Sequence, residues 1–460
     1  MPRAVVVGGG PAGLFTALLV ARAGWNVTVL ERDPAPPPAL PENAFDAWDR
    51  PGVPQWRQIH GMPARERLLL LKHLPDVAQQ AYELGAWDFD LASALKSSSR
   101  LPDDDELQRF CCRRPLLEWV LSDTCRRERG VTVRRGTAAA GLIGDIAKRP
   151  VVTGVRLAGG EVLPAELVVD ASGRRSDAGA WLAALGAAVP TWEAQPVGIV
   201  YYTRFYELIE DADKPISFRA DIGYAITGLA YADGRIFSIH FFVDAADRRL
   251  RALHLEPAFE AAVAAVPRLA DGRLRGRPVS GVQSMGAFEN RIRPILSNGA
   301  PLAFGWLPVG DSLCHTDPSS GRGLPQALWH AVALTETLHQ FPTCDDVAAA
   351  YTDLVAGPTR AVFDDVAEAS ASRVASWHAE PTSEQREVVR LAMTTAAERD
   401  PWLWRKLTRY EQFLSPPESV FGDPEVLAAA RRLADAPAPS LGPDRETMVG
   451  VIAESTRTIP

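Results

Sequence analysis

The glycine-rich segment near the start of the chain has the residue types and spacing of a phosphate-binding turn. Gly8, Gly10 and Gly13 form the pattern G-x-G-x-x-G after an apolar run, and Glu31 follows eighteen residues after Gly13. Glycine lets the backbone approach a pyrophosphate, and the free N–H groups of the following helix attract it. Glu31 can accept hydrogen bonds from an adenosine ribose. The segment therefore predicts a site for a dinucleotide, NAD or FAD, to which Pro11, Ala12 and Arg32 also belong.

Two later segments also consist of an apolar strand that ends in an acidic residue. The first ends at Asp170, followed by Ala171-Ser172-Gly173, and the second ends at Gly310-Asp311. A loop with His315 and Pro318 then leads through Gly321, Arg322, Gly323 and Leu324 into a long predicted helix. Asp311 can bind a ribityl hydroxyl of FAD. The glycine turn at the helix start can direct N–H groups at the N1/C2 region of a flavin ring, where negative charge develops on reduction.

With these three motifs in order, residues 3–340 resemble the FAD-dependent monooxygenases of the p-hydroxybenzoate hydroxylase fold. The resemblance implies FAD as cofactor, NAD(P)H as a transient reductant and O2 as cosubstrate. It also implies oxygen transfer through a C4a-hydroperoxyflavin. Arg114, followed by helix-spaced leucines, matches a family arginine that reaches the FAD region. The alternative is an arginine that only solvates the helix start.

The loop from Arg50 to His60 resembles an R-x-G-V-P-Q-x-R-x-x-H segment of a bacterial subgroup that includes polyether-pathway epoxidases. The chain departs from it at Trp56, where a small residue is usual, and at Gln58, where a histidine is frequent. Arg57 and His60 can border the flavin, although a buried structural histidine is as good an interpretation of His60. The candidate catalytic residues are Pro318, Gly321, Arg57, His60 and His315, the last with a structural alternative.

The segment 191–288 is rich in β-branched and aromatic residues and predicts an antiparallel sheet that covers the flavin. Strand alternation places Tyr202, Arg204 and Tyr206 on one face, and Tyr201, Thr203 and Phe205 on the other. One set packs on helices and the other can line an apolar pocket. The candidate substrate-binding residues are Tyr202, Arg204, Tyr206, Tyr224 and Phe241. An aromatic stripe that belongs to the core is the alternative.

These elements predict an α/β fold: an FAD-binding, Rossmann-like parallel sheet with an inserted, mainly antiparallel sheet and a C-terminal helical region. The expected parts are an FAD-binding domain over 1–190, the substrate-binding sheet over 191–288, a return to the FAD-binding domain over 289–342, and helices with a tail over 343–460.

Composition excludes several other classes of function. The 460 residues are 47% hydrophobic and 23% charged, which is typical of a globular protein, and the net charge of −8 provides no basic field for nucleic acid or anionic lipid. The five cysteines show no metal-binding spacing. The apolar stretch from Leu14 to Ala23 is too short to span a bilayer. We expect a cytoplasmic protein without a metal or a membrane span.

The expected function is a monooxygenase that hydroxylates or epoxidises a hydrophobic small molecule, such as a natural-product intermediate. One alternative is a reductase or dehydrogenase of an isoprenoid-like substrate, since such enzymes share the Asp-Ala-Ser-Gly variant. A flavin halogenase needs a Trp-x-Trp-x-Ile-Pro segment, whereas Trp402-Leu403-Trp404 runs on into Arg405. A non-catalytic binder is the third alternative. The choice between NADPH and NADH, a partner reductase and the oligomeric state stay open.

Overall fold

The structure is a computed structural model. One of its two large sheets is parallel and has five strands. The strand order is β20-β9-β1-β2-β5, with bounds Trp306–Pro308, Leu167–Asp170, Arg3–Val7, Asn26–Glu31 and Val131–Arg135. The structure describes residues 1–96, 99–146, 149–210, 212, 217–393, 395–435 and 441–457. Part of the predicted tail, including Pro437 and Pro439, lies outside these ranges.

Both faces of the parallel sheet are covered, which explains why its strands are continuously apolar. Ala4 and Val6 of β1 face a core built with helices α1 (Pro11–Arg22), α5 (Arg114–Arg127) and α9 (Gly323–Gln340). Val5 and Val7 face a second core with α6 (Ala178–Ala184) and the antiparallel strands β6 (Ala139–Asp145), β7 (Val151–Leu157) and β8 (Val162–Pro164). The carboxyl ends of the parallel strands therefore meet at one edge, where the three predicted motifs lie.

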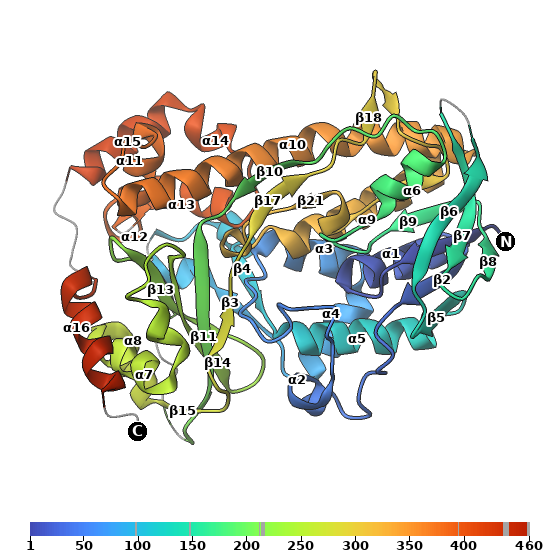
Figure 1. Ribbon diagram of the computed structural model, residues 1–460. Helices are drawn as coiled ribbons and strands as arrows, with labels where there is room; N and C mark the ends of the chain where they lie inside the picture. The colour runs from blue at the N-terminus through green and yellow to red at the C-terminus, as the bar shows by residue number, and fades with distance from the viewer. Residues whose placement is uncertain are drawn as a thin grey trace.

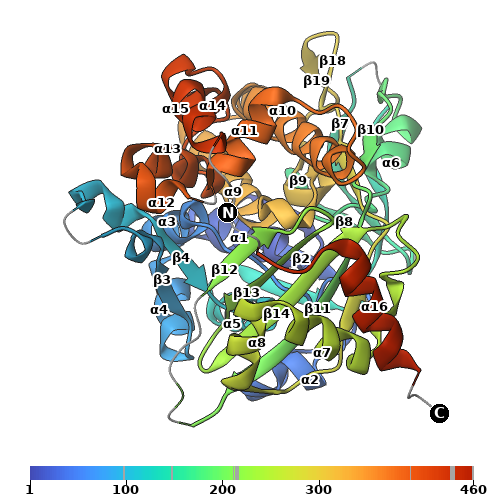
Figure 2. The ribbon, with the colours of Figure 1, turned by 90° about the vertical axis from the view of Figure 1, so that its left-hand side faces the viewer.

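The inserted sheet lies beside the parallel sheet and is antiparallel throughout (Figure 1). Its order is β12-β13-β14-β11-β15, with bounds Phe218–Asp221, Ala225–Tyr231, Ile236–Asp244, Ile199–Leu208 and Gly276–Pro278, and β16 (Gln283–Met285) also pairs with β11. Figure 2 shows helices α7 (Glu256–Ala265), α8 (Pro267–Leu274) and α16 (Arg445–Thr456) on its outer face. The inner face is directed toward the rest of the protein.

Short elements join the two sheets. Strands β10 (Glu193–Pro196), β17 (Glu289–Ile292) and β21 (Cys314–His315) form a three-stranded sheet, and β18 (Leu296–Ser297) pairs with β19 (Ala300–Pro301). Strands β3 (Trp87–Asp90) and β4 (Gln108–Cys111) pair with each other, and the helices in the same part of the chain are α2 (Ala44–Ala47), α3 (Ala64–His73) and α4 (Pro75–Glu83). The Trp87 indole donates to the carbonyl of Ala232 in the β13–β14 turn, 2.8 Å away. This contact ties the inserted sheet to the N-terminal part.

The C-terminal region is helical, as predicted. Helix α10 (Cys344–Trp377) packs along α9, and a separate small core joins α11 (Glu384–Met393), α13 (Pro401–Glu411), α14 (Glu418–Phe421) and α15 (Pro424–Ala434), with α12 (Ala396–Arg399) beside α13. The predicted fold class is confirmed. The boundaries at residues 190, 288 and 342 stay predictions.

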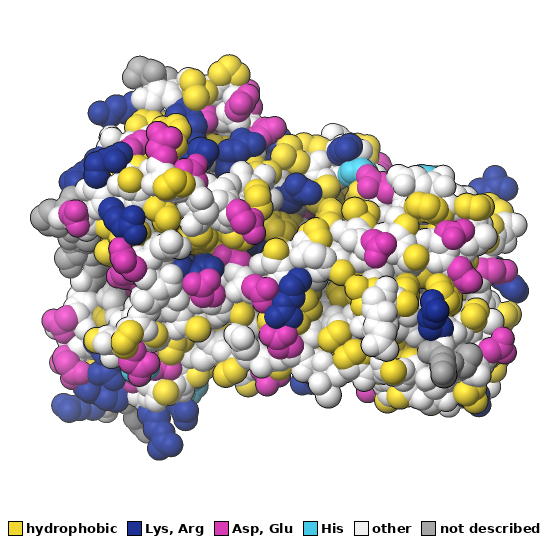
Figure 3. Space-filling model, turned by 90° about the horizontal axis from the view of Figure 1, so that it is seen from above, with side chains coloured by type: hydrophobic (Ala, Val, Ile, Leu, Met, Phe, Trp, Pro, Cys, Tyr) yellow, Lys and Arg dark blue, Asp and Glu magenta, His cyan; other side chains and the backbone are white. Residues whose placement is uncertain are grey.

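On the face seen from above, basic and acidic side chains are interspersed with each other (Figure 3). Within the described ranges, no helix combines the length and the apolar character needed to cross a membrane. The same ranges contain no group of three or more His, Cys, Asp or Glu side chains that could hold a metal ion.

The turn between β1 and α1 leads to the first prediction. A Cβ on Gly13 would lie 1.9 Å from the carbonyl oxygen of Gly8, whereas a Cβ on Gly10 would have no atom within 4 Å. We expect Gly13→Ala to lower the free energy of unfolding by about 1–3 kcal/mol or more, because backbone must move to make room. Gly10→Ala, the matched control, should cost less, about 0.5–1 kcal/mol, because Gly10 is the N-cap of the following helix and alanine is a poorer N-cap residue than glycine. Urea unfolding followed by tryptophan fluorescence measures both, and equal effects would contradict the proposed packing role of Gly13.

Candidate functional site

A long cleft runs along the carboxyl ends of the parallel strands and reaches the inserted sheet. Its walls come from the turn after β1 (7–12), the end of β2 (30–33), the loop 50–61, the turn after β9 (171–175) and the loop before α9 (311–324). Tyr201 of β11 and Met285 of β16 line the far end. The cleft therefore joins all three predicted motifs to the inner face of the inserted sheet.

The turn between β1 and α1 has the strand–turn–helix geometry that the sequence predicts. Gly8, Gly10, Pro11 and Ala12 line the cleft, and Gly8 has a φ of 114°, which favours glycine. Helix α1 begins at Pro11, and the Gly10 N-cap provides no side-chain hydrogen bond to its first turn. The N–H groups and the positive end of the helix dipole are therefore free for an anion. Gly13 does not line the cleft, and its role is to let the helix pack against the turn.

Glu31 lies at one end of the cleft in a buried ion-pair network. Arg50, whose side chain is 1% exposed, donates to Glu31 Oε2 at 2.8 Å and to Glu118 Oε2 at 3.0 Å. Its Nε lies 3.4 Å from Asp33 Oδ2, and Arg114 Nε donates to the other oxygen of Glu118 at 2.6 Å. A carboxylate has about four lone-pair positions, so Glu31 still has room to accept from a ligand.

Two tryptophans enclose the guanidinium of Arg50. It lies 5.1 Å from the ring centroid of Trp48 and 5.7 Å from that of Trp56, and the two rings contact each other edge to face. Cation–π attraction stabilises a desolvated guanidinium in this position. The departure from the bacterial subgroup at Trp56 thus has a structural role, because Trp56 closes the network.

Arg114 and His60 both line the cleft and lie close together. Arg114 Nη1 is 3.4 Å from His60 Nε2, and His60 Nδ1 is 3.0 Å from the carbonyl oxygen of Gln58. Burial, together with the charge of Arg114, lowers the pKa of His60 to about 3. A neutral ring that donates from Nδ1 and accepts at Nε2 satisfies both contacts. His60 is therefore a neutral hydrogen-bonding group rather than an acid at neutral pH.

Arg57 and Arg32 have different positions. Arg57 does not line the cleft, because its guanidinium donates to the carbonyl oxygens of Phe45 and Asp46 at 2.7 and 3.0 Å and holds the loop against α2. The expectation that Arg57 borders the flavin stays a prediction. Arg32 does line the cleft, and its Nη2 lies 3.4 Å from the carbonyl oxygen of Gly52.

The third motif supplies the wall opposite α1. His315, Pro318, Gly321, Gly323, Leu324 and Asp311 all line the cleft. Within the described part of the chain, the Asp311 carboxylate makes no hydrogen bond or ion pair, so it is free to accept from a ligand. His315 Nδ1 lies 2.8 Å from the carbonyl oxygen of Glu289, which fixes its ring.

Three residues that were predicted to bind the cofactor do not line the cleft. Gly310, with a φ of 60°, donates its N–H to His330 Nδ1 at 3.0 Å. The side chain of Arg322 points away and donates to the carbonyls of Tyr410 and Glu411 at the end of α13. Asp170 accepts from the Ser172 N–H and from the hydroxyls of Ser172 and Ser176, so its carboxylate shapes the turn after β9.

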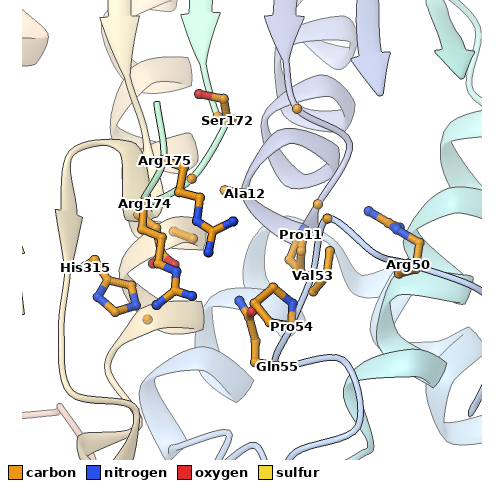
Figure 4. A pocket seen from close by; sticks show the side chains of 18 of the residues that line it. Pro11, Ala12, Arg50, Val53, Pro54, Gln55, Ser172, Arg174, Arg175 and His315 are labelled. Atoms are coloured by element: carbon orange, nitrogen blue, oxygen red, sulfur yellow. The ribbon is translucent and has the colours of Figure 1, made fainter. Parts of the chain in front are cut away.

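Sequence reasoning missed two arginines that follow this turn. Figure 4 shows Arg174 and Arg175 extending into the cleft between His315 and the Pro11–Ala12 turn. Neither guanidinium has a side-chain partner among the described residues, and burial together with the charge of Arg175 lowers the pKa of Arg174. Two adjacent arginines directly after the Asp-Ala-Ser-Gly turn were the available signal, because paired guanidinium groups suit phosphate.

The face of the inserted sheet that lies toward the cleft is the opposite of the one predicted from the sequence. The alternation of side chains is as expected, but Tyr202, Tyr206, Tyr224 and Phe241 pack in the outer core with α7, α8 and α16. Arg204 is on the same face and pairs with Glu256 and Glu260. Helices cover the face that carries these five residues, as the alternative of an aromatic stripe in the core expects, and their assignment to substrate binding stays a prediction. Tyr201, on the other face, lines the cleft and donates to Asp317 Oδ1 at 2.8 Å.

Comparison with known proteins supports a flavoprotein fold. The family model described as FAD dependent oxidoreductase matches residues 3–39. A search of curated proteins gives no match.

Solved structures resemble the chain over most of its length at low sequence identity. PqsL, a probable FAD-dependent monooxygenase from Pseudomonas aeruginosa, is 15% identical, with a TM-score of 0.60 over 82% of this chain and 99% of that chain. A mutant of 2-methyl-3-hydroxypyridine-5-carboxylic acid oxygenase is 16% identical, with a TM-score of 0.57 over 90% and 98%. The flavin-dependent brominase Bmp2 is 15% identical, with a TM-score of 0.59 over 94% and 97%. The chain thus shares the fold of these flavin enzymes, and the polyether-epoxidase subgroup stays a prediction.

The Arg50 network leads to a second prediction. Arg50→Met leaves Glu31, Asp33 and Glu118 buried without their common cation, so we expect a loss of about 3–5 kcal/mol in the free energy of unfolding. Arg57→Met is a matched control from the same loop, and it should cost about 1 kcal/mol because, among the described residues, the Arg57 guanidinium donates only to backbone carbonyls. Urea unfolding compares the two. A loss for Arg50→Met no larger than for the control would contradict the importance of the network.

The third prediction concerns the pH dependence of His60. Since its folded-state pKa of about 3 lies below the ordinary value of 6.5, the imidazole should stay neutral at pH 5. The unfolded chain then binds more protons, so the stability that His60 contributes is complete above pH 6.5 and declines as the pH falls toward 3. Imidazole 15N chemical shifts, assigned with His60→Gln, report the titration. Arg114→Gln should raise the pKa, and a wild-type midpoint near 6.5 would contradict the prediction.

Proposed function

We propose that the protein is an FAD-dependent monooxygenase that uses NAD(P)H and O2 to hydroxylate or epoxidise a small organic molecule with an apolar body. The observation that carries the proposal is the continuous cleft, which joins an uncapped helix N-terminus at Pro11, the free carboxylate of Asp311 and the inner face of the inserted sheet. The likeness of the whole fold to flavin enzymes supports it.

The cleft fits the parts of FAD in order along its length. Glu31 can accept hydrogen bonds from the adenosine ribose, and the open space at Gly10 lets the pyrophosphate reach the N-terminus of α1. Arg174 and Arg175 face the same turn and can neutralise phosphate charge. Asp311 can accept from the ribityl chain. A dinucleotide thus meets a suitable group at each of its polar parts.

When bound, FAD would supply the redox chemistry, in which two electrons from NAD(P)H allow one oxygen atom of O2 to enter the substrate and the other to leave as water. The chain holds and shields the ring. Gly321 has a φ of 67° and turns the loop into α9, an eighteen-residue helix with no side-chain cap, whose N-terminus attracts negative charge. Pro318, from the same loop, lines the cleft on this side.

The residues around the ring end provide position and water exclusion rather than strong acid–base catalysis. His60 is neutral, His315 is held by the Glu289 carbonyl, and the Tyr201 hydroxyl is engaged by Asp317. Ile59, Met285 and Tyr201 present apolar surface to the end of the cleft. An enclosed apolar site that excludes water suits oxygen transfer, in which side chains need not act as formal catalysts.

The absorption spectrum of the purified protein tests the proposal. Flavin bands that bleach with NADPH under nitrogen and return on admission of air are the expected result. A protein that binds no FAD would overturn the proposal. Bands that NADPH cannot bleach, even with candidate substrates present, would favour a partner reductase or a dehydrogenase and remove the oxygenation claim.

Asp311 provides the fourth prediction. Asp311→Asn removes the free carboxylate in the cleft without changing its volume, so FAD should bind roughly 10- to 100-fold more weakly, the usual effect of losing a hydrogen bond to a charged group. Asp317→Asn is not a suitable control because Asp317 is buried in contact with Arg373. Asp345→Asn is suitable, since Asp345 lies in the exposed first turn of α10. Equal FAD dissociation constants for Asp311→Asn and wild type would remove Asp311 from the site.

A further inference from the structure

The C-terminal end of helix α13 meets the starts of two other helices, α9 and α3 (Figure 2). Helix α9 begins at Gly323 and α3 begins at Ala64, and each follows a loop that lines the cleft. The two loops also approach each other, since a Cβ on Gly321 would lie 3.5 Å from the carbonyl oxygen of Gly61. One helix end thus contacts the elements that carry both loops.

Arg322 joins the end of α13 to the start of α9. Its guanidinium donates from Nη2 to the carbonyl oxygen of Tyr410 at 3.1 Å, and from Nη1 to that of Glu411 at 3.2 Å. The last carbonyls of a helix lack partners within it, and a cation at this end is favoured by the helix dipole. Arg322 is also the N-cap residue of α9 and lies between Gly321 and Gly323. Its side chain therefore fixes the backbone of the glycine turn from outside the cleft.

Gln412 joins the same helix end to α3. Its backbone carbonyl accepts from the N–H of Arg65 at 3.2 Å, and its side-chain Oε1 accepts from the N–H of Ala64 at 3.2 Å. The first N–H groups of a helix have no carbonyl partner within it, so Gln412 supplies two of the missing acceptors. The residue is buried. The helix that follows the loop 50–61 is thus held by the neighbour of the residues that bind Arg322.

Phe413 has a strained backbone at this junction. The N–H of Leu414 donates to the carbonyl of Arg409 at 2.8 Å, and the N–H of Phe413 donates to that of Tyr410 at 3.0 Å, which is the pattern of a Schellman motif. The motif needs a left-handed residue, usually glycine, whereas Phe413 has a φ of 63°. The ring centroid of Phe413 lies 4.8 Å from the guanidinium carbon of Arg322. Glycine would suit the backbone, but only an aromatic ring attracts the cation.

We propose that Arg322, Gln412 and Phe413 form a clamp through which the C-terminal helices position the two loops at the flavin end of the cleft. The inference rests on the proposed function, which places the flavin ring at this end. Arg322 does not line the cleft, so it acts as a positioning residue through the backbone of the glycine turn. The N–H groups at the start of α9 can stabilise the negative charge of reduced flavin only when they point at it, because hydrogen bonds weaken steeply with angle.

The fifth prediction concerns the midpoint potential of bound FAD in Arg322→Met. With the turn released, reduced flavin loses part of its stabilisation, so the equilibrium constant for two-electron reduction should fall about tenfold, which is about 30 mV in midpoint potential. Arg409→Met is the matched control, because it removes the same charge from the last turn of α13 while Arg409 pairs with Glu106 instead. Its potential should equal that of wild type. Dye-coupled reduction under nitrogen measures both.

Two further variants separate position from charge. Gln412→Leu leaves the net charge unchanged, so a fall of about threefold in the same equilibrium constant would come from the released loop alone. Arg322→Lys keeps the charge but lacks the planar fork that reaches both carbonyls, so it should restore only part of the potential. If charge alone acted, Arg322→Lys would match wild type and Gln412→Leu would have no effect, and either result contradicts the clamp.

Hydrogen exchange of the FAD-free protein tests the clamp without flavin. In Arg322→Met, a peptide that covers residues 317–326 should exchange at least about threefold faster than in wild type, because the turn opens more readily. Val426→Ala is the control for general destabilisation, since Val426 is fully buried in the small core of the C-terminal helices and lies outside the clamp. It should lower the free energy of unfolding without changing this peptide's exchange or the flavin potential.

Three outcomes would overturn the inference. These are an unaltered potential in Arg322→Met, unaltered exchange of the 317–326 peptide in the same variant, or equal changes in Val426→Ala and Arg322→Met. If Arg322→Met does not fold, Arg322→Lys and Gln412→Leu carry the test with the same readouts. A wild-type protein that binds no FAD overturns the proposed function instead, and the exchange experiment still decides whether the clamp holds the turn.

Discussion

One end of the cleft depends on the buried ion pairs that the Arg50 guanidinium makes with three carboxylates. Three carboxylates from β2, the following loop and α5 converge on a side chain with almost no exposure to solvent, between the rings of Trp48 and Trp56. Buried charges are tolerated only when they are paired and hydrogen-bonded. The network therefore constrains three segments at once, and through Glu118 it also holds Arg114 beside His60.

Asp317 plays a comparable part at the other end. Although burial alone would raise its pKa, Arg373 and the hydrogen bonds from Tyr201 and Ser319 outweigh this and lower it. The carboxylate joins the inserted sheet through Tyr201 and α10 through Arg373 and Ser370. The loop that carries Pro318 and Gly321 is thereby positioned by elements far apart in the sequence.

The two supporting networks and the inner face of the inserted sheet differ in how their polar groups are satisfied. Around Arg50 and Asp317, nearly every charge has a partner, as a rigid support requires. On the inner face of the inserted sheet, the Thr203 hydroxyl and His240 Nδ1 are buried and have no hydrogen-bond partner among the described residues. The contrast separates the paired charges that support the cleft from the inner face of the inserted sheet.

The sequence by itself determined the local parts of this architecture. Three features depend on residues close in the chain: the G-x-G-x-x-G turn, the strand–turn–helix around it, and the acid at Asp311. Their patterns could therefore be recognised in the sequence. The alternation of side chains along β11 could also be predicted, since successive side chains in a strand point to opposite faces. Arg57 and Arg50 show what the sequence could not predict. Both lie in one loop, and only the fold shows which of them pairs with the carboxylates.

Only the tertiary structure decided which face of the inserted sheet meets the cleft. Helix α16, more than two hundred residues after β11, packs on the side of Tyr202 and Tyr206 and leaves Tyr201 and Thr203 on the inner side. Strand pairing also aligns Arg219, His240 and Thr203 across this sheet, although they are not neighbours in sequence. Strand periodicity has two equivalent faces, and the choice between them depends on long-range packing that no local pattern encodes.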